Sequence, residues 1–216
     1  MLAATTDELE RRFRSDVKDI KTAADGSDFG CLWTDADVYG YMTVACDALA
    51  KLTQGLYKTL QLQIAANNAW VKLPSYVQHI REAHLLSNNA RVEQVDAADV
   101  DYAPASGAPQ LYVRDYDRRS LRLLPTPTIP DTLEIQAAVS IALPMEAGLP
   151  VPFTDTEDQQ LLLEKMKALA YLKHDAETED LTRARVHADL YAQGALSRMS
   201  LLGNLRRTPP VMRMTD

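Results

Sequence analysis

The stretch LWTDADVYGYMTVACDALAKLT, residues 32–53, predicts one amphipathic helix around which the rest of the chain is arranged. Thr34 is placed to cap this helix, because its hydroxyl can accept a hydrogen bond from the backbone amide of Asp37. Asp35 and Asp37 put negative charge in the first turn, where the helix dipole favours it. Apolar side chains then recur at steps of three and four and form one apolar face. They are Val38, Tyr41, Met42, Ala45, Leu49 and Leu52.

Trp33 stands just before this cap, where its ring can fold back onto Val38 as a hydrophobic staple and pack against the closing helices of the chain. A core helix with a good N-cap explains every residue of the stretch. Neither this stretch nor the rest of the chain contains a catalytic motif. Function therefore has to be inferred from architecture and from resemblance.

The composition is that of an ordinary globular protein of 216 residues, with 46% hydrophobic and 25% charged residues. This length suits one large domain or two small ones. The formal net charge of −7 gives no general attraction to DNA or RNA. No apolar run approaches the roughly 20 residues of a membrane span, and the first residues lack the pattern of a secretory signal. Cys31 precedes the cap of the predicted helix and Cys46 lies in its interior, too far along it for a disulfide, so we expect reduced thiols and synthesis in a cytosol.

Other elements follow from the same patterns. A shorter helix is expected over residues 6–19, with Thr6 as its cap, and a loop follows at 22–30. From Tyr57 onward the hydrophobic period changes from near 3.6 to 2, which is typical of half-buried strands. The expected strands are 57–64, 70–73, 80–86, 91–95, 111–113, 121–124 and 132–143.

The strand at 132–143 carries the clearest alternation and predicts an antiparallel sheet with one solvated or partner-facing side. Its polar face holds Glu134, Gln136 and Ser140. Its predicted core-facing side chains are Leu133, Ile135, Ala137, Val139, Ile141 and Leu143. Residues 99–109, with two prolines and a glycine, are expected to form an exposed excursion.

Two helices are predicted to close the fold as an antiparallel hairpin, because the link between them is short. The first begins at Asp155 or Thr156 and runs to about His174, and the second covers about 179–202. Residues 204–216 show no periodic pattern, so an extended tail is expected there. Apolar residues of the second helix keep a near-heptad register at Leu181, Ala184, Ala188, Tyr191, Ala195, Met199 and Leu202.

The order of these elements predicts an α+β fold. It combines a helical bundle formed by the N-terminal and C-terminal helices with an antiparallel β insertion and an extended C-terminal tail. The predicted parts are the N-terminal helices at 1–56, the β insertion at 57–152, the C-terminal helical hairpin at 153–203 and the tail at 204–216.

The histidines do not form a metal-binding pattern. His79 and His84 are five residues apart, which places them on opposite faces of a strand. His174 and His187 fall on separate helices and could meet, but no cysteines or carboxylates with metal-ligand spacing surround them. The glycines never make the spacing of a nucleophile elbow, a Walker loop or a dinucleotide turn. We therefore expect no catalytic residues, no cofactor and no metal, in a protein that is not an enzyme.

One charged cluster has two interpretations. Arg114, Asp115, Asp117, Arg118 and Arg119 mix both signs at the tip of a predicted hairpin. The simpler interpretation is a solvated tip. The functional one is a loop that contacts a neighbouring subunit or a tail protein.

The tail is the second candidate contact. It combines arginine forks that suit carboxylates, apolar anchors, and two prolines that hold the chain extended and reduce the entropy lost on docking. A disordered terminus with no partner is the alternative. The candidate docking residues are Arg206, Arg207, Pro209, Pro210, Val211, Met212, Arg213 and Met214.

Several short motifs carry a family resemblance when they are taken together. They are Phe13-Arg14-Ser15-Asp16 with Asp19, Leu32-Trp33-Thr34-Asp35 with Tyr41, Ala45 and Ala48, Leu73-Pro74, Leu124-Pro125-Thr126-Pro127, and Tyr171-Leu172-Lys173-His174-Asp175-Ala176-Glu177. In this order they resemble the head-to-tail adaptor (connector) proteins of tailed bacteriophages over nearly the whole chain. The excursion at 99–109 has no counterpart in that pattern.

The resemblance implies a structural virion protein of the phage neck. Such adaptors form a ring, twelvefold in that family, docked beneath the portal of a DNA-filled head. The implied partners are the portal protein, which receives the C-terminal tail, a tail or nozzle protein at the opposite rim, and identical subunits. Genomic DNA passes through the channel without sequence-specific binding, and no membrane is involved. The alternatives are another neck component such as a tail-completion or tube protein, an acidic cytosolic binding module, or an enzyme whose site arises from scattered residues.

Overall fold

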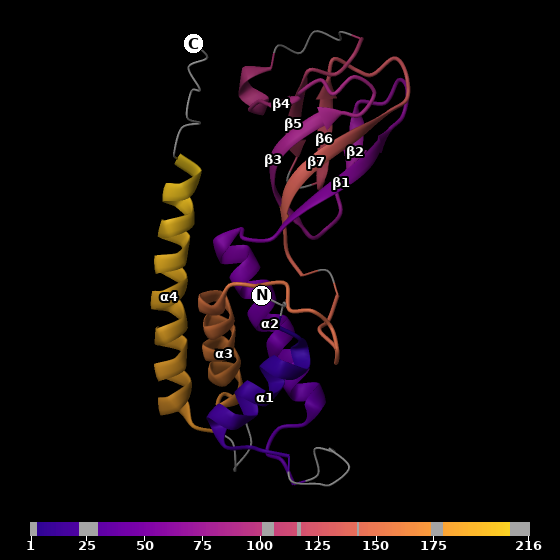
Figure 1. The fold of residues 1–216 in the computed structure, drawn as a ribbon. Helices are drawn as coiled ribbons and strands as arrows, with labels where there is room; N and C mark the ends of the chain where they lie inside the picture. The colour runs from indigo at the N-terminus through magenta and orange to yellow at the C-terminus, as the bar shows by residue number, and fades with distance from the viewer. Residues whose placement is uncertain are drawn as a thin grey trace, which may run out of the picture. The chain divides into compact units, whose positions relative to one another are not determined.

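The computed structural model describes residues 4–21, 30–100, 106–115, 118–141, 143–173 and 179–207, without the side chains of residues 99 and 202–207. Within these residues the fold contains helices and two sheets, which confirms the predicted α+β class (Figure 1). The chain divides into two compact units, Met1–Thr53 with Ile141–Asp216, and Gln54–Ser140. We call them the helical unit and the β unit.

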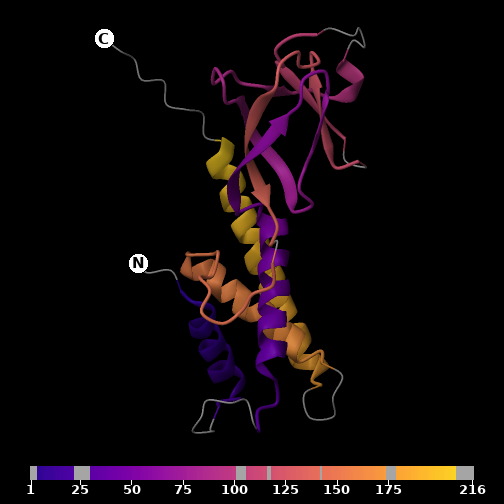
Figure 2. The same cartoon turned by 90° about the vertical axis from the view of Figure 1, so that its right-hand side faces the viewer.

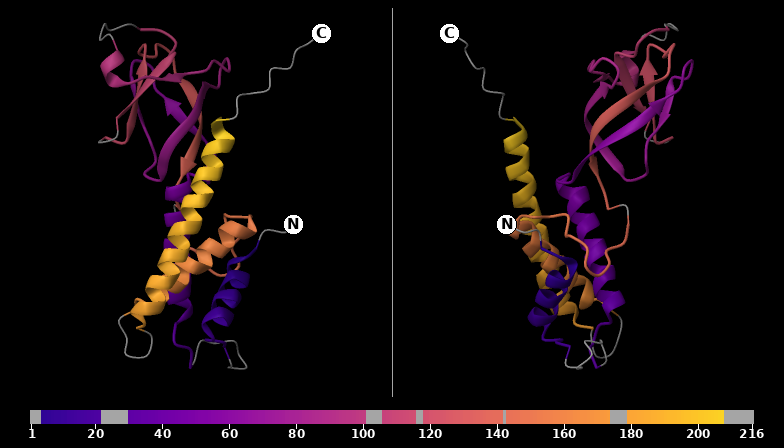
Figure 3. Two further views of the ribbon diagram at one scale, coloured as in Figure 1. Left: turned by 90° about the vertical axis from the view of Figure 1, so that its left-hand side faces the viewer. Right: turned by 45° about the vertical axis from the view of Figure 1, so that its right-hand side comes forward.

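The helical unit joins helices that precede and follow the β unit in the sequence. They are α1 (Thr6–Val17), α2 (Asp35–Thr53), α3 (Thr156–Ala170) and α4 (Leu181–Arg207). Helix α3 contacts α1, α2 and α4, and α4 also runs against α2 (Figure 1, Figure 3). The core of this unit therefore forms only when segments far apart in the sequence meet.

Helix α2 begins as its sequence predicts. The Thr34 hydroxyl accepts a hydrogen bond from the amide of Asp37 at 3.2 Å, and the Asp37 carboxylate accepts one from the amide of Thr34 at 3.0 Å. The helix ends at Thr53, as predicted, and Gln54 takes the left-handed conformation that follows it, with φ of 48°. Leu52, expected on the apolar face, is among the exposed residues.

Helix α1 is capped one residue earlier than predicted. The Thr5 hydroxyl, not that of Thr6, accepts the capping hydrogen bond from the amide of Glu8, at 3.3 Å. The Thr6 hydroxyl instead donates to the carbonyl oxygen of Glu146 at 2.7 Å, within the same unit. The helix stops short of its predicted end, at the left-handed Lys18 with φ of 60°.

The last two helices differ from the prediction at their ends. Helix α3 is capped by Asp155 as expected, but it ends at Ala170, earlier than predicted. Helix α4 continues beyond Leu202 to Arg207, so the prediction of an extended tail from 204 onward was wrong for its first residues. Residues 208–216 lie outside the described residues.

The β unit contains two sheets (Figure 2). Their strand orders are β1-β7-β3 and β2-β6-β5-β4. Its strands are β1 (Tyr57–Ile64), β2 (Trp70–Lys72), β3 (Val77–Leu85), β4 (Glu93–Gln94), β5 (Leu111–Asp115), β6 (Ser120–Leu124) and β7 (Asp131–Val139). A short 3-10 helix, Ala97–Asp99, follows β4. One apolar core takes side chains from both sheets, so the sheets pack face to face.

Strand β7 is the centre of its sheet and pairs antiparallel with β1 and β3. Leu133 and Val139 point into the core, as the alternation predicts. The strand is shorter than predicted because its neighbours end there, with Val77 opposite Val139. Ile141 and Leu143 therefore do not extend the core face, and Leu143 is 77% exposed.

One strand pair departs from the predicted antiparallel pattern. Strand β4 pairs with β5 in parallel, with Glu93 opposite Leu111 and Gln94 opposite Tyr112. Parallel neighbours need a long connection between them, and residues 95–110 supply it. Residues 101–105 of the predicted excursion at 99–109 lie outside the described residues.

Candidate functional site

Trp33 lies at the centre of the helical unit. Its side chain is buried, and its Nε1 donates a hydrogen bond to the carbonyl oxygen of Ala170 at 3.2 Å. The rings of Phe13 and Tyr171 meet it edge to face, each with a centroid distance of 5.9 Å. Trp33 therefore joins α1, the start of α2 and the end of α3, as its predicted packing on the terminal helices requires.

Arg14 places a buried positive charge next to this tryptophan. Its Nε donates to Glu10 at 2.7 Å, and one terminal nitrogen donates both to Asp19 at 2.9 Å and to the carbonyl oxygen of Trp33 at 3.0 Å. The other terminal nitrogen donates to Asp35 at 2.7 Å. Because Arg14 is almost fully buried, each carboxylate offsets the unfavourable desolvation of the guanidinium.

Asp19 and Lys21 complete the charged cluster. Asp19 accepts hydrogen bonds from the amides of Leu32 at 2.7 Å and Trp33 at 3.3 Å, which fixes the chain just before α2. Lys21 lies 2.8 Å from Asp35. Burial opposes the charge on Asp35, but hydrogen bonds from Lys21 and Arg14 outweigh it and lower the pKa of this carboxyl.

These contacts explain the motif residues that carry the family resemblance. Arg14, Asp19, Trp33 and Asp35 belong to one packed cluster and therefore define the fold of the helical unit. The sequence motifs point to these residues but not to the ion pairs between them. One signal was available, because Glu10 and Arg14 are spaced four apart, and Arg14 follows Phe13 on the buried side of α1.

A second charged cluster joins α3 to α4. Glu164 Oε2 lies 2.7 Å from Nδ1 of His187, and Glu164 Oε1 accepts a hydrogen bond from Lys167 at 2.6 Å. Burial disfavours the charged carboxylate, but the hydrogen bonds with Lys167 and His187 outweigh it and lower the pKa of Glu164. The His187 ring also stacks on Tyr171 at a centroid distance of 5.8 Å. His174, its predicted neighbour, lies outside the described residues.

The predicted contact loop divides into structural and exposed residues. Arg114 donates to the carbonyl oxygens of Gln78 at 2.6 Å and Val77 at 3.3 Å, so its side chain is bonded to the start of β3. The Asp115 carboxylate accepts a hydrogen bond from the amide of Arg118 at 3.0 Å within the turn. The side chain of Arg118 is 74% exposed. Arg119 is exposed as well, and Asp117 lies outside the described residues.

The predicted docking tail is only partly covered by the structure. Arg206 and Arg207 form the end of α4, where the backbone is helical. The other predicted tail residues lie outside the part of the chain that the structure describes. They are Pro209, Pro210, Val211, Met212, Arg213 and Met214.

Helix α4 exposes an apolar surface that the heptad pattern does not predict. Ala184, Tyr191 and Ala195 are buried, but Leu181 and Met199, predicted in the same seam, are exposed. A heptad pattern marks apolar residues without showing which of them a neighbour covers. The exposed apolar side chains of α4, each between 42% and 59% exposed, are Leu181, Val186, Leu190, Leu196, Met199 and Leu201.

A groove of about 330 Å³ runs between α3 and α4 beside this surface. Leu161, Gly194 and Leu201 supply its apolar lining, and Arg198 and Glu157 lie at its polar side. A side chain at position 194 would overlap that of Leu161, so the glycine allows the two helices to approach closely.

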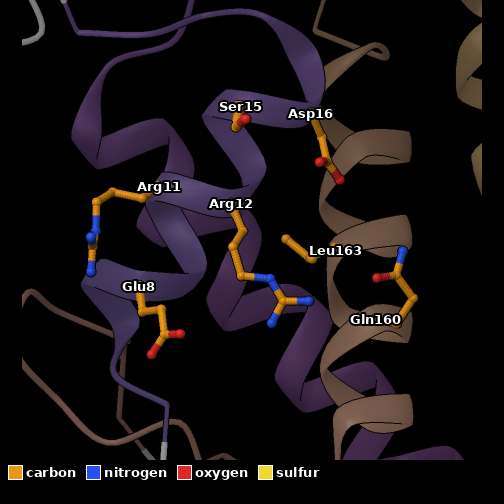
Figure 4. Close-up of a pocket in the computed structure, with 7 residues that line it drawn as sticks. All are labelled: Glu8, Arg11, Arg12, Ser15, Asp16, Gln160 and Leu163. Atoms are coloured by element: carbon orange, nitrogen blue, oxygen red, sulfur yellow. The ribbon is translucent and has the colours of Figure 1, made fainter.

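A second groove, of about 380 Å³, lies between α1 and α3 (Figure 4). Arg12 reaches from α1 towards α3, where it donates to Gln159 at 3.2 Å, and Leu163 lies beside it. Glu8 and Asp16 bring negative charge to the same groove. The groove thus carries both charge signs without the paired nucleophile and base of a hydrolase.

The described residues contain no group of three His, Cys, Asp or Glu side chains that could hold a metal ion. No helix in the described ranges is long and apolar enough to cross a bilayer. The observed features are packed charge clusters and exposed apolar or cationic surfaces, which suit contact with other proteins.

Comparison with known proteins agrees with this picture. No curated protein matches the chain. The family described as SU10 adaptor protein matches residues 4–214, which include both units. This family consists of structural adaptor proteins of phages and confirms the resemblance at that level. The chain belongs to the SU10 adaptor protein family.

Proposed function

We propose that the chain is one subunit of a ring in the phage neck, placed between the portal and the tail or nozzle protein. The family match over residues 4–214 carries this proposal. In this arrangement the ring, twelvefold as in the resembled adaptors, continues the channel through which DNA leaves the head. The helices at 1–56 and 153–203 form its bundle, and the insertion at 57–152 provides surfaces for partners.

The exposed surface of helix α4 supports the proposal of a ring. Its exposed apolar residues form two stripes on opposite sides of the face buried within the subunit, as the rotation of 100° per residue in an α-helix requires. One stripe is Leu181, Leu196 and Met199, and the other is Val186, Leu190 and Leu201. A ring contact joins different patches of neighbouring subunits, and two separate stripes fit such a contact.

The end of α4 and the residues that follow it form the portal contact in this proposal. Their arginines offer bidentate hydrogen bonds to portal carboxylates, and their apolar residues offer anchors. The residues assigned to this contact are Arg206, Arg207, Pro209, Pro210, Val211, Met212, Arg213 and Met214.

The net charge of −7 supports a conduit for DNA. An acidic ring repels the phosphate backbone, so DNA passes without being gripped. The exposed Arg118 and Arg119 are assigned to a neighbouring subunit or a tail protein rather than to DNA.

Electron microscopy of the protein mixed with its portal tests this function. We expect single subunits or small oligomers without portal, and rings with rotational symmetry once portal is added. Leu190→Asp in one stripe and Leu196→Asp in the other should each prevent rings. Ile129→Asp is the control, because Ile129 is an exposed apolar residue of the β unit outside both stripes. Particles that never show symmetry with portal would exclude the ring.

Deletion of residues 208–216 tests the portal contact separately. Thermal unfolding should be unchanged, since these residues follow the end of α4, whereas portal binding should be lost. A truncated chain that binds portal as tightly as the full chain would move the contact elsewhere.

A further inference from the structure

Trp70 is an unusual surface residue, because an indole in a strand is normally packed. It lies in β2, an edge strand of the four-stranded sheet, and is 41% exposed. Val71 points into the core. Side chains alternate along a strand, so Trp70 and Lys72 share the outer face.

Two arginines lie over this exposed indole. Arg122 stands opposite Trp70 in the neighbouring strand β6, and its guanidinium carbon is 6.0 Å from the centroid of the indole. Arg118, in the turn before β6, lies 5.7 Å from the same centroid. Trp70, Lys72, Arg118 and Arg122 form a cationic surface that we call the Trp70 patch.

We propose that the Trp70 patch binds a short acidic segment of a partner protein. Each guanidinium is planar and can donate two parallel hydrogen bonds to a carboxylate. The indole restrains both guanidiniums by cation–π contact before binding, which reduces the entropy lost when a carboxylate docks. Trp and Arg are also the side chains that most often dominate the binding energy of protein interfaces.

The charge distribution favours a peptide over DNA. The patch concentrates arginine and lysine on a chain whose net charge is −7, and Asp115 offsets part of the Arg118 charge at 3.7 Å. Screening limits electrostatic contact to about 8 Å at physiological salt, so a short segment experiences mainly the patch. A DNA duplex is several screening lengths long, so its phosphates are also repelled by acidic residues outside the patch. Charge complementarity therefore selects a compact run of carboxylates.

This inference does not depend on the ring or on the portal contact. The Trp70 patch consists of residues of the β unit alone. Of the predicted contact loop it includes Arg118, and Trp70, Lys72 and Arg122 lie outside that loop. It also assigns the kind of partner, which the proposed neck position leaves open. Its test therefore uses the isolated full-length chain.

The test measures binding of a fluorescently labelled hexaglutamate peptide by anisotropy at physiological salt, with hexaglutamine and a 20-base-pair DNA duplex as comparison probes. We expect hexaglutamate to bind and the other two to bind at least about tenfold more weakly. Arg118→Gln with Arg122→Gln should weaken hexaglutamate binding at least about tenfold, since two charged contacts are lost. Lys72→Gln, a change at an exposed position that preserves folding, should weaken it about threefold.

Arg91→Gln provides the matched control, because Arg91 is an exposed arginine of the same unit outside the patch. It should leave the affinity unchanged. Equal loss with Arg91→Gln and Lys72→Gln, equal binding of hexaglutamine, tighter binding of the duplex, or no binding of hexaglutamate at all would each overturn the proposal.

Discussion

The helical unit and the β unit fill their cores with different chemistry. In the helical unit the buried side chains include the charged residues Glu10, Arg14, Asp19, Glu164 and Lys167. In the described residues of the β unit, Ser120 is the one buried polar side chain. Buried charge is tolerated only where partners satisfy it, so the helical unit depends on complete ion-pair clusters. The β unit depends on apolar shape and on strand register.

The largest effect should come from Trp33→Ala. Removal of this buried indole leaves a cavity and an unsatisfied carbonyl at Ala170, so the helical unit should lose roughly 3 to 5 kcal/mol of stability. Urea unfolding followed by amide NMR signals from each unit measures the loss. Trp70→Ala is the matched change in the β unit and should have a smaller effect, because Trp70 is partly exposed. A loss below about 1 kcal/mol for Trp33→Ala would show that its packing is dispensable.

Arg14→Met should have the next largest effect. Methionine keeps the apolar stem but leaves Glu10, Asp19 and Asp35 without their shared cation, so we expect a loss of about 3 kcal/mol in the helical unit. The β unit, followed by its own amide signals, should unfold at the same urea concentration as in the unmodified protein. Unchanged stability would mean that Lys21 alone compensates the three carboxylates.

Acidification should lower the stability of the helical unit more than that of the β unit, with a smaller effect than either substitution. The pKa values of Asp35 and Glu164 are lowered in the folded chain, because hydrogen bonds with cationic partners outweigh the effect of burial. A lowered folded-state pKa stabilises the fold above the unfolded pKa of about 4, and this stabilisation disappears as the pH falls through the folded-state values. The helical unit should therefore melt at lower temperature at pH 3.5 than at pH 7. If the β unit lost as much stability, the ion-paired carboxylates of the helical unit would not explain the difference.

The smallest effect should follow Arg91→Gln. Its ion pair with Glu93 has a distance of 4.0 Å and both side chains are exposed, so stability should change by less than about 0.5 kcal/mol. Chemical unfolding of the β unit provides the measurement. A larger change would mean that surface ion pairs contribute to the stability of the β unit, and that apolar shape and strand register alone do not determine it.

Local patterns in the sequence predict local structure well. The Thr34 cap depends on residues three apart, and the pairing of β5 with β6 depends on one short turn. The parallel pairing of β4 with β5 joins strands separated by residues 95–110, and no local pattern encodes it. Local propensity therefore explains which elements form, while tertiary contacts decide how they pair.

The candidate surfaces were harder to predict for a related reason. Arg114 was expected at a contact loop, but its backbone partners Gln78 and Val77 come from another part of the chain. The apolar residues of α4 look alike in sequence, although α2 and α3 cover only one side of the helix. Trp70 was expected to continue an apolar strand pattern, and its exposure depends on its edge position. In each case the missing information is the identity of distant neighbours.

The division of the helical unit by the β unit has a consequence for synthesis. The nitrogen of Trp33 bonds to a residue 137 positions later in the chain. At a typical elongation rate of about 5 to 20 residues per second, its acceptor emerges on the order of ten seconds after it. The β unit is continuous in sequence and can complete its sheets during that interval. Until α3 is synthesised, a nascent chain would thus carry a finished β unit together with a Trp33 indole that lacks its partner at Ala170. This interval is when a chaperone would have most to protect.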